Sequence, residues 1–313
     1  MSLKRGVLMS IKISQREYGN FGKCVFLENG SASVGITLDV GPRIIYFSLK
    51  GKENIMLEDR ERYFTEKAGE YGEWVNYGGH RLWCAPEVNP ETYSPDNAPV
   101  SCKADGSSVT LTPPPTPFGK AFSVTVSMDE EKPLVSITHR IKNVSDRPAR
   151  YAAWAITGLT VNGVLKAPLS RKKTGYLGNR VLSLWDYSDI NDPRFKMTNT
   201  EIRLRQDTFK KNAFKCGFNV DEGFVSYSVN GQTFVKSVPD YDPDRCYPDF
   251  SCNFETYTNS LFLECENIGE YREYAPGEEA VLSEKWFLLD NEGDEEPELD
   301  RIKNSLENTG FFA

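Results

Sequence analysis

Residues 134–143 read Leu134-Val135-Ser136-Ile137-Thr138-His139-Arg140-Ile141-Lys142-Asn143, a stretch in which apolar and polar side chains alternate. Alternation with a period of two is typical of a β-strand that buries one of its faces. His139 shares the apolar face with Val135 and Ile137, so it is expected to be a buried, hydrogen-bonded core residue. The stretch therefore predicts a half-buried strand, and much of the remaining chain repeats its pattern.

Short runs of the same kind recur between clusters of Gly, Pro, Asn and Asp. They cover residues 33–40, 43–50, 109–112, 121–128, 150–157, 201–205, 214–219, 224–228, 233–237, 253–258, 260–267 and 280–289. Few helical patterns lie between them, which predicts an all-β protein built from antiparallel sheets packed as a sandwich. No shift in composition marks a boundary, so residues 1–313 are expected to form one domain.

Three segments fall outside this strand pattern. The first eight residues are set aside as an added or disordered start. The run Pro113-Pro114-Pro115-Thr116-Pro117 cannot join a central ladder of hydrogen bonds and is expected to be a surface connection. Residues 290–313 are interpreted as an acidic linker in solvent, followed by a short C-terminal helix over residues 299–306.

The bulk composition excludes several classes of function. The 313 residues include 45 acidic and 37 basic side chains, a formal charge of −8 that disfavours nucleic acid as a partner. No apolar run approaches the length of a membrane span and no secretory leader is recognisable, so we expect a cytoplasmic protein. Seven cysteines without a C-x-x-C pair favour reduced structural thiols. Neither a metal site nor an organic cofactor is predicted, and the sequence does not reveal the oligomeric state.

One segment carries unusually dense chemistry: Tyr77-Gly78-Gly79-His80-Arg81-Leu82-Trp83-Cys84-Ala85-Pro86-Glu87. Paired glycines allow a backbone turn with positive φ that approaches a ligand closely, and His80 can exchange a proton near neutral pH. The alternative is a glycine-turned loop whose histidine is merely hydrogen-bonded. Arg81 offers hydrogen-bond donors, and Trp83 offers a flat apolar face suited to sugars. The candidate binding residues of this region are therefore Asn76, Arg81, Trp83 and Glu87.

A second candidate group lies near the end of the chain, in residues 261–267. Strand alternation places Glu264 and Glu266 on one face, about 6.5 to 7 Å apart along the strand. At that spacing two carboxylates raise each other's proton affinity if the face is shielded from water, as a proton-accepting group requires. The alternative is a wet outer face of an antiparallel sheet.

The preceding strand also presents polar side chains on one face. Asn253, Glu255 and Tyr257 alternate onto it, just after the turn-like Tyr247-Pro248-Asp249. Adjacent polar strand faces form a surface that suits a hydroxyl-rich ligand better than a phosphate, because acidic groups accept hydrogen bonds and repel anions. Asp249, Asn253, Glu255, Tyr257 and Glu266 are therefore further candidate substrate-binding residues.

The order of these motifs resembles the galactose mutarotase-like superfamily over most of residues 20 to 290. The motifs are Val40-Gly41-Pro42-Arg43-Ile44-Ile45, Tyr77 to Trp83, Pro86-Glu87, Ile141-Lys142-Asn143-Val144-Ser145, Tyr247-Pro248-Asp249, Leu263-Glu264-Cys265-Glu266 and Ala275-Pro276-Gly277-Glu278. The chain looks closer to a separate branch than to the true aldose 1-epimerases. The resemblance implies a supersandwich of two large, mostly antiparallel sheets, with a sugar site in a cleft of the concave sheet.

In the epimerases a glutamate removes the proton of the anomeric hydroxyl while a histidine protonates the ring oxygen. The glutamate strand of that family resembles Leu263-Glu264-Cys265-Glu266, which gives Glu264 the candidate role of base. The family's acid histidine lies in a region that reads Tyr151-Ala152-Ala153-Trp154 here and contains no histidine. Trp154 can stack on a sugar but cannot protonate it, so His80 becomes the candidate acid.

Two classes of function follow from this reading. The first is a carbohydrate-active protein that binds a mono- or oligosaccharide and acts as an aldose 1-epimerase-like isomerase. The second is a non-catalytic carbohydrate-binding or sensing module, which the absent mid-chain histidine favours. Both predict a small-molecule carbohydrate as the partner. A third, weaker alternative is cleavage of a polysaccharide by elimination, since a fold does not fix a function.

Overall fold

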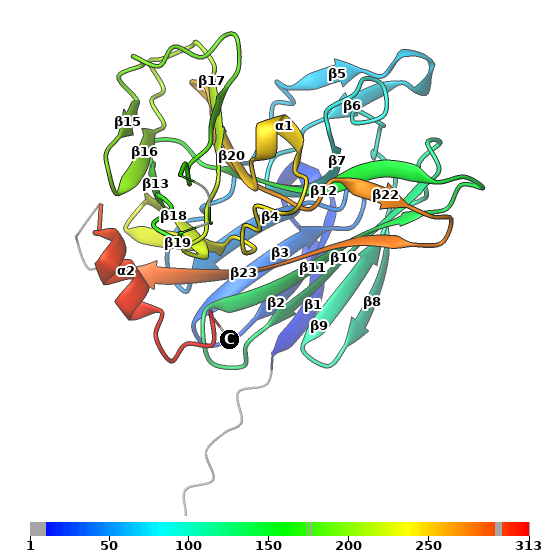
Figure 1. Cartoon of the computed structure of the whole chain (residues 1–313). Helices are drawn as coiled ribbons and strands as arrows, with labels where there is room; N and C mark the ends of the chain where they lie inside the picture. The colour runs from blue at the N-terminus through cyan, green and yellow to red at the C-terminus, as the bar shows by residue number, and fades with distance from the viewer. Residues whose placement is uncertain (1–10, 174, 176, 292–295, 313) are drawn as a thin grey trace, which may run out of the picture.

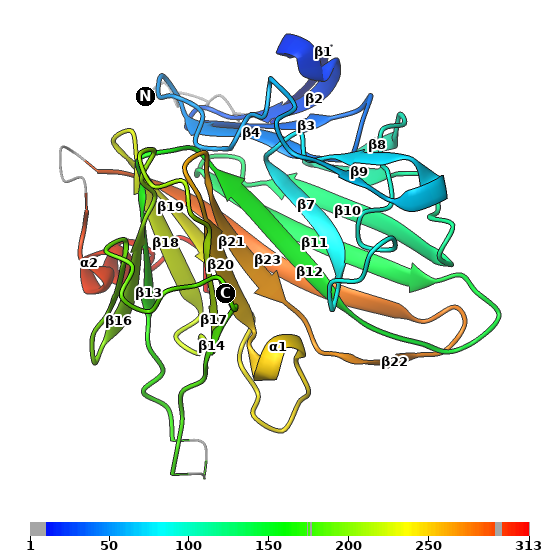
Figure 2. The same ribbon diagram turned by 90° about the horizontal axis from the view of Figure 1, so that it is seen from above.

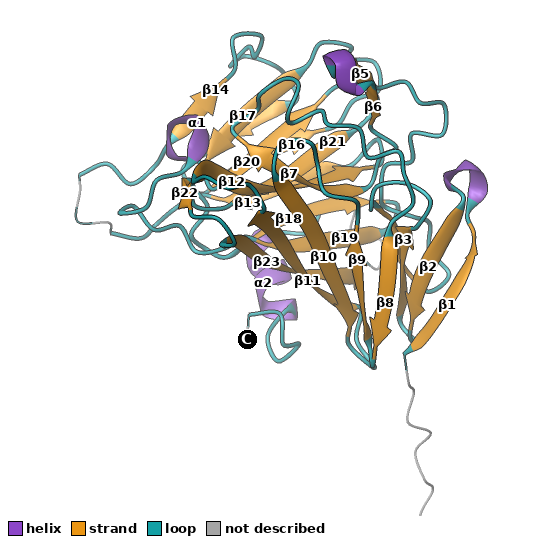
Figure 3. Cartoon of the chain, turned by 90° about the vertical axis from the view of Figure 1, so that its right-hand side faces the viewer, coloured by secondary structure: helices purple, strands orange, loops and turns teal. Residues whose placement is uncertain are grey.

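The computed structural model describes residues 11–173, 175, 177–291 and 296–312. Two large antiparallel sheets face each other along the length of the molecule (Figure 1). Figure 3 shows that strands and loops make up nearly all of the chain and that the helices are short. The predicted all-β sandwich is therefore confirmed. The expectations for residues 1–8 and for the acidic residues 292–295 lie outside the described residues.

The first sheet is formed by strands from both halves of the chain. In spatial order its strands are β1 (Lys12–Glu17), β2 (Lys23–Glu28), β3 (Ala32–Thr37), β4 (Ile44–Leu49), β7 (His80–Ala85), β12 (Ala149–Leu159), β21 (Leu263–Ile268), β20 (Phe254–Thr258), β17 (Phe214–Phe218) and β14 (Leu182–Leu184), and β22 (Arg272–Tyr274) pairs with β12. Figure 2 shows β7, β12, β21 and β20 side by side. These four strands bring residues near 80, 154, 255 and 264 together.

The second sheet is likewise antiparallel. Its spatial order is β15 (Phe195–Met197), β16 (Glu201–Arg205), β13 (Val164–Pro168), β18 (Phe224–Val229), β19 (Gln232–Ser237), β23 (Glu279–Asp290), β11 (Leu134–Asn143), β10 (Lys120–Met128), β9 (Ser108–Thr112) and β8 (Ser101–Asp105). The smaller elements are the pair β5 (Thr65–Lys67) and β6 (Glu73–Val75), the 3₁₀ turns η1 (Gly19–Phe21) and η2 (Gly69–Tyr71), and the helices α1 (Pro248–Ser251) and α2 (Leu299–Ser305).

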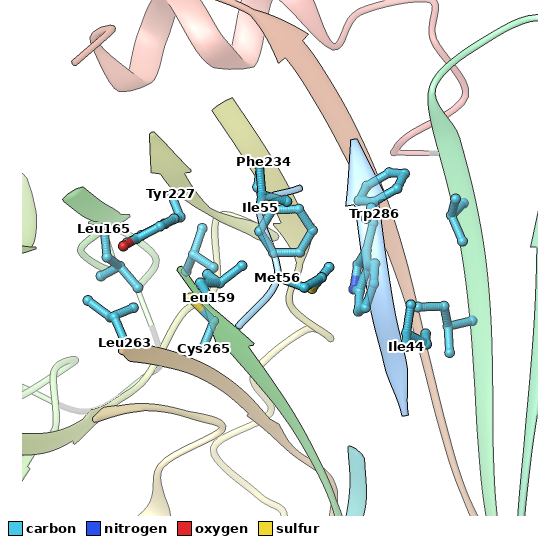
Figure 4. Packing of buried hydrophobic residues seen from close by; sticks show 14 of the residues in the cluster. Ile44, Ile55, Met56, Leu159, Leu165, Tyr227, Phe234, Leu263, Cys265 and Trp286 are labelled. Carbon is cyan, nitrogen blue, oxygen red and sulfur yellow. The ribbon is translucent and has the colours of Figure 1, made fainter. Parts of the chain in front are cut away.

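The main hydrophobic core lies between the two sheets. Leu263 and Cys265 of β21 pack there in one cluster with Trp286 of β23 and Phe234 of β19 (Figure 4). Alternation along β21 therefore turns Glu264 and Glu266 to the opposite face of the first sheet, away from the second. The core thus fixes which side of the first sheet is free to carry polar chemistry.

Two predictions about connecting segments are also confirmed. Residues 113–117 link β9 to β10 without joining a ladder, and most of them are exposed. The predicted C-terminal helix is α2, whose Ile302 is fully buried in a cluster with Phe224 and Phe287 of the second sheet. The helix therefore covers part of that sheet's outer face.

Candidate functional site

The segment 77–87, interpreted as a ligand-binding segment with a glycine-turned loop as the alternative, contains a strand of the first sheet. Gly78 and Gly79 have φ values of 95° and 63°, as predicted for paired glycines in a tight turn. A Cβ atom at Gly78 would collide with the carbonyl of Leu57, and one at Gly79 with that of Ile44. The glycines thus serve a close approach between backbone segments, not an approach to a ligand. The chain then enters β7 at His80.

Alternation along β7 separates the two residues that the sequence interpretation expects to act together. His80 points between the sheets, where its Nε2 lies 2.7 Å from Nε2 of His139 on β11. Arg81 and Trp83 point to the opposite face and line a cleft there. His80 is 2% exposed and does not line that cleft. The assignment of His80 as a sugar-facing acid is therefore wrong, because neighbouring residues of a strand face opposite ways.

The cleft lies on the face of the first sheet that is turned away from the core, and its volume is about 270 Å³. It brings together residues from β7, β12, β17, β20 and β21. The predicted site residues that line it are Asn76, Arg81, Trp83, Glu87, Trp154, Tyr257, Glu264 and Glu266. The predicted site residues that do not line it are His80, Asp249, Asn253 and Glu255.

Glu264 is held by a buried ion pair. Nη1 of Arg81 donates a hydrogen bond of 2.9 Å to Oε1 of Glu264, and both side chains are less than 10% exposed. The guanidinium carbon of Arg81 lies 4.2 Å from the ring centroid of Trp83, so the cation is fixed against an aromatic face. This contact positions the carboxylate of Glu264 at the wall of the cleft.

Glu266 lies beside Glu264 on the same face of β21 and belongs to a second charged group. Its Oε2 accepts hydrogen bonds from Nε1 of Trp154 at 2.9 Å and from Nζ of Lys215 at 3.1 Å. Nζ of Lys215 is also 2.8 Å from Oε2 of Glu255. Burial raises the pKa of Glu255 well above its usual range and raises that of Glu266. Lys215 thus bridges two buried carboxyl groups.

Aromatic side chains form another wall of the cleft. The ring centroid of Trp83 is 4.9 Å from that of Trp74, 5.2 Å from that of Tyr93 and 5.7 Å from that of Trp154. Glu87 is exposed at this wall and accepts a hydrogen bond from the Tyr93 hydroxyl. Apolar faces next to hydrogen-bonding groups match the two-sided character of a sugar ring.

Two of the predicted binding residues have structural roles instead. The amide of Asn253 donates to the carbonyls of Val220 and Pro239 at 2.8 and 2.9 Å, so it fixes neighbouring loops. Asp249 lies in α1 with φ = 51°, and its carbonyl accepts a hydrogen bond from the hydroxyl of Ser183. Neither residue is among those that line the cleft.

Sequence reasoning misses several residues that line the cleft, among them Trp74, Tyr93, Tyr187 and Lys215. Lys215 alone has a detectable signal, since it interrupts the apolar residues Phe214, Cys216 and Phe218 at the strand period. These three pack in the core, which turns Lys215 outward. The other three come from irregular segments or a short strand, where periodicity gives no direction.

The buried histidines form a hydrogen-bond chain whose proton positions can be deduced. Nδ1 of His139 must donate to the carbonyl of Leu282, 3.0 Å away, so its Nε2 accepts from Nε2 of His80. Nδ1 of His80 then accepts from the hydroxyl of Thr157 at 2.9 Å, which in turn accepts from Nζ of Lys236 at 2.7 Å. Burial lowers the pKa of both imidazoles, which favours this neutral arrangement. The prediction of a buried, hydrogen-bonded His139 is confirmed.

This chain also accounts for the main cluster of metal-ligand side chains. Within the described ranges, ligand atoms of His80, His139 and Glu284 gather within 4.8 Å of one another. Each of these side chains already has a protein partner, and Glu284 accepts from Asn267 at 2.7 Å and from Trp286 at 2.8 Å. The cluster is satisfied internally as a polar network between the sheets.

None of the helices in the described residues is long and apolar enough to cross a membrane.

Neither the protein-family models nor the curated proteins include a match to this chain. Solved structures do. A galactose mutarotase-like protein from Lactobacillus casei covers 85% of this chain and 100% of its own, with a TM-score of 0.54 and 12% identity. The chain has the galactose mutarotase-like fold.

Two further structures bear on this fold. A galactose mutarotase-like protein from Clostridium acetobutylicum covers 90% of this chain and 99% of its own, with a TM-score of 0.54 and 10% identity. A TPR-domain containing protein from Parabacteroides distasonis has a TM-score of 0.59 and 15% identity over 90% of this chain. This chain spans only 51% of that longer protein. At such identities the comparisons establish the mutarotase-like architecture alone.

Proposed function

We propose that the cleft binds a neutral mono- or oligosaccharide and interconverts the anomers of its reducing sugar. The observation that supports this most is the Arg81–Glu264 ion pair beside the aromatic wall of Trp83 and Trp154. A fixed carboxylate next to stacking faces can accept the anomeric proton of a sugar held against those faces. The mutarotase-like fold, with sheet strands that carry these residues, agrees with this assignment.

The charges of the cleft favour a sugar without phosphate or carboxylate groups. Both basic residues that line it are already paired, Arg81 with Glu264 and Lys215 with Glu255 and Glu266. Glu66 and Glu87 add two further acidic side chains to the lining. An anionic substrate would meet repulsion here, whereas sugar hydroxyls can donate to the carboxylates.

A non-catalytic binding module remains the second candidate. The observation that favours it is the place of the two histidines: both are buried between the sheets and neither lines the cleft. The usual pairing of a glutamate with a histidine is therefore not available in this cleft. The site then needs another proton donor if it catalyses anomer exchange.

The rates of anomer exchange of neutral and of phosphorylated aldoses, measured with and without the protein, distinguish these functions. We expect the protein to accelerate exchange of a neutral hexose, followed by two-dimensional NMR exchange spectroscopy, and to leave the corresponding 6-phosphate at its uncatalysed rate. Binding of the hexose without acceleration selects the binding module. If the protein neither binds any neutral aldose nor accelerates its anomer exchange, the proposed function is wrong.

A further inference from the structure

We propose that the carboxyl group of Glu266 is the proton donor of the anomer exchange, in place of the absent histidine. This inference rests on the proposed function and names a second catalytic residue for it. Three observations carry it: the charge balance of the buried cluster, an oxygen of Glu266 without a partner, and the spacing of Glu266 from Glu264.

The charge balance requires one bound proton. Glu255, Glu266 and Lys215 are 0%, 1% and 6% exposed, and together they carry two carboxyl groups for one ammonium group. The other cation of the cleft, Arg81, is already paired with Glu264. An uncompensated buried charge is costly, so the Glu255–Lys215–Glu266 group holds a proton on one of its carboxyl groups.

Glu266 is the member of this pair that can deliver the proton. Glu266 lines the cleft, whereas Glu255 does not. Its Oε2 accepts from Trp154 and Lys215, while its Oε1 is buried and has no hydrogen-bond partner among the described residues. A buried oxygen that lacks a partner at a cleft wall is available to a ligand. Glu255 is the cross-strand neighbour of Glu266 in the ladder and shares Lys215 with it.

The spacing of the two glutamates suits a single anomeric centre. Side chains two residues apart on a strand lie about 6.5 to 7 Å apart on one face. The two reacting oxygens of an aldose are bonded to the same carbon, and each needs one hydrogen bond of about 2.7 to 2.8 Å. A carboxylate on one side and a carboxyl group on the other can therefore span the anomeric carbon. Burial raises the pKa of both Glu266 and Glu255, which agrees with one proton held by this pair.

The step is balanced without any further reactant. The Glu264 carboxylate takes the proton of the anomeric hydroxyl, and Glu266 gives its proton to the ring oxygen. The bond between the anomeric carbon and the ring oxygen breaks, and a carbonyl forms at the anomeric carbon. After rotation about the neighbouring carbon–carbon bond, the two protons return by the reverse transfers. The ring then closes with either configuration.

Glu266→Gln tests this role, because the amide keeps the shape and an acceptor oxygen but cannot supply the proton. With wild-type protein that accelerates exchange, we expect a loss of about 10²-fold or more in the exchange rate. Hexose affinity, measured by calorimetry, should stay within a few-fold. A rate within threefold of the wild type overturns the inference for Glu266 and leaves the proposed function standing. If the wild-type protein does not accelerate anomer exchange, both the role of Glu266 and the proposed function are overturned.

Glu255→Gln provides a second test that does not depend on the folding of the first variant. Without Glu255, the charge of Lys215 is balanced by Glu266 alone, so Glu266 loses its proton at a lower pH. The charged and titratable groups around Glu266 are Arg81 on β7, Lys215 and Cys216 on β17, Lys236 on β19, Glu255 and Tyr257 on β20, Glu264 and Cys265 on β21, and Tyr187. We expect the alkaline limb of the pH–rate profile to move to lower pH. An unmoved limb contradicts the shared proton.

Discussion

Replacing Glu264 by Gln is expected to slow anomer exchange of a neutral hexose by about 10²- to 10⁴-fold, the usual contribution of a positioned general base. Glutamine is of nearly the same size, and its amide oxygen can still accept the hydrogen bond that Arg81 donates at 2.9 Å. The cleft therefore keeps its shape while it loses the group that takes the proton. Sugar affinity should change much less than the rate.

The control for this variant is Glu279→Gln, the same substitution on β23 of the other sheet. Glu279 is only partly buried, pairs with Arg140 at the surface and is not among the residues that line the cleft. Its exchange rate should equal that of the wild type. If Glu264→Gln folds, binds the hexose and keeps the full rate, Glu264 is not the base.

The free energy of unfolding is expected to fall as the pH is lowered through 6.5, because of the two buried histidines. Burial lowers the pKa of both His80 and His139 in the folded protein. In the unfolded chain each titrates near 6.5, so below that pH the unfolded state binds protons that the folded state refuses. The stabilisation is complete above pH 6.5 and is lost as the pH falls. Between pH 7.5 and 5.5 the loss is at most about 1.4 kcal/mol per histidine.

The chain offers a clean comparison for this effect, since His80 and His139 are its two histidines. Glu255 and Glu266 have raised pKa values and act in the opposite direction, because their protonation favours the folded state. The free energy of unfolding is measured by urea unfolding at several pH values for the wild type and for the double variant His80→Gln/His139→Gln. The histidine contribution is the difference between the two proteins in the slope of that free energy against pH. Parallel slopes would show that the imidazoles are not held neutral in the fold.

Much of the fold is predictable because a strand pattern is local. The run 134–143 matches β11 at both ends, and 201–205 matches β16. The strand within residues 77–87 is harder to predict, because the glycines and charged residues of this run are typical of a loop. The alternation of Leu82 and Cys84 with Arg81 and Trp83 still marks β7, and it would have turned His80 away from Arg81.

The site is less predictable because it depends on strand register. Glu264 and Glu266 share a face whatever their neighbours are, so their place at the cleft follows from β21 alone. Lys215 meets Glu266 only because β17, β20 and β21 pair with one particular register. A shift of one residue would turn Lys215 into the core. Nothing local in the sequence determines that pairing, which is why the bridge between Glu255 and Glu266 emerges from the structure.

The indole N–H signals of the tryptophans test most directly whether a saccharide occupies the cleft. Trp74, Trp83 and Trp154 line the cleft, whereas Trp286 is buried between the sheets, where its Nε1 donates to Glu284 at 2.8 Å. In ¹⁵N-labelled protein titrated with a neutral hexose, we predict saturable shifts of the Trp83 and Trp154 indole signals and an unmoved Trp286 signal. If the cleft indoles stay in place up to high sugar concentration, or if Trp286 alone moves, the saccharide site is not where this account puts it.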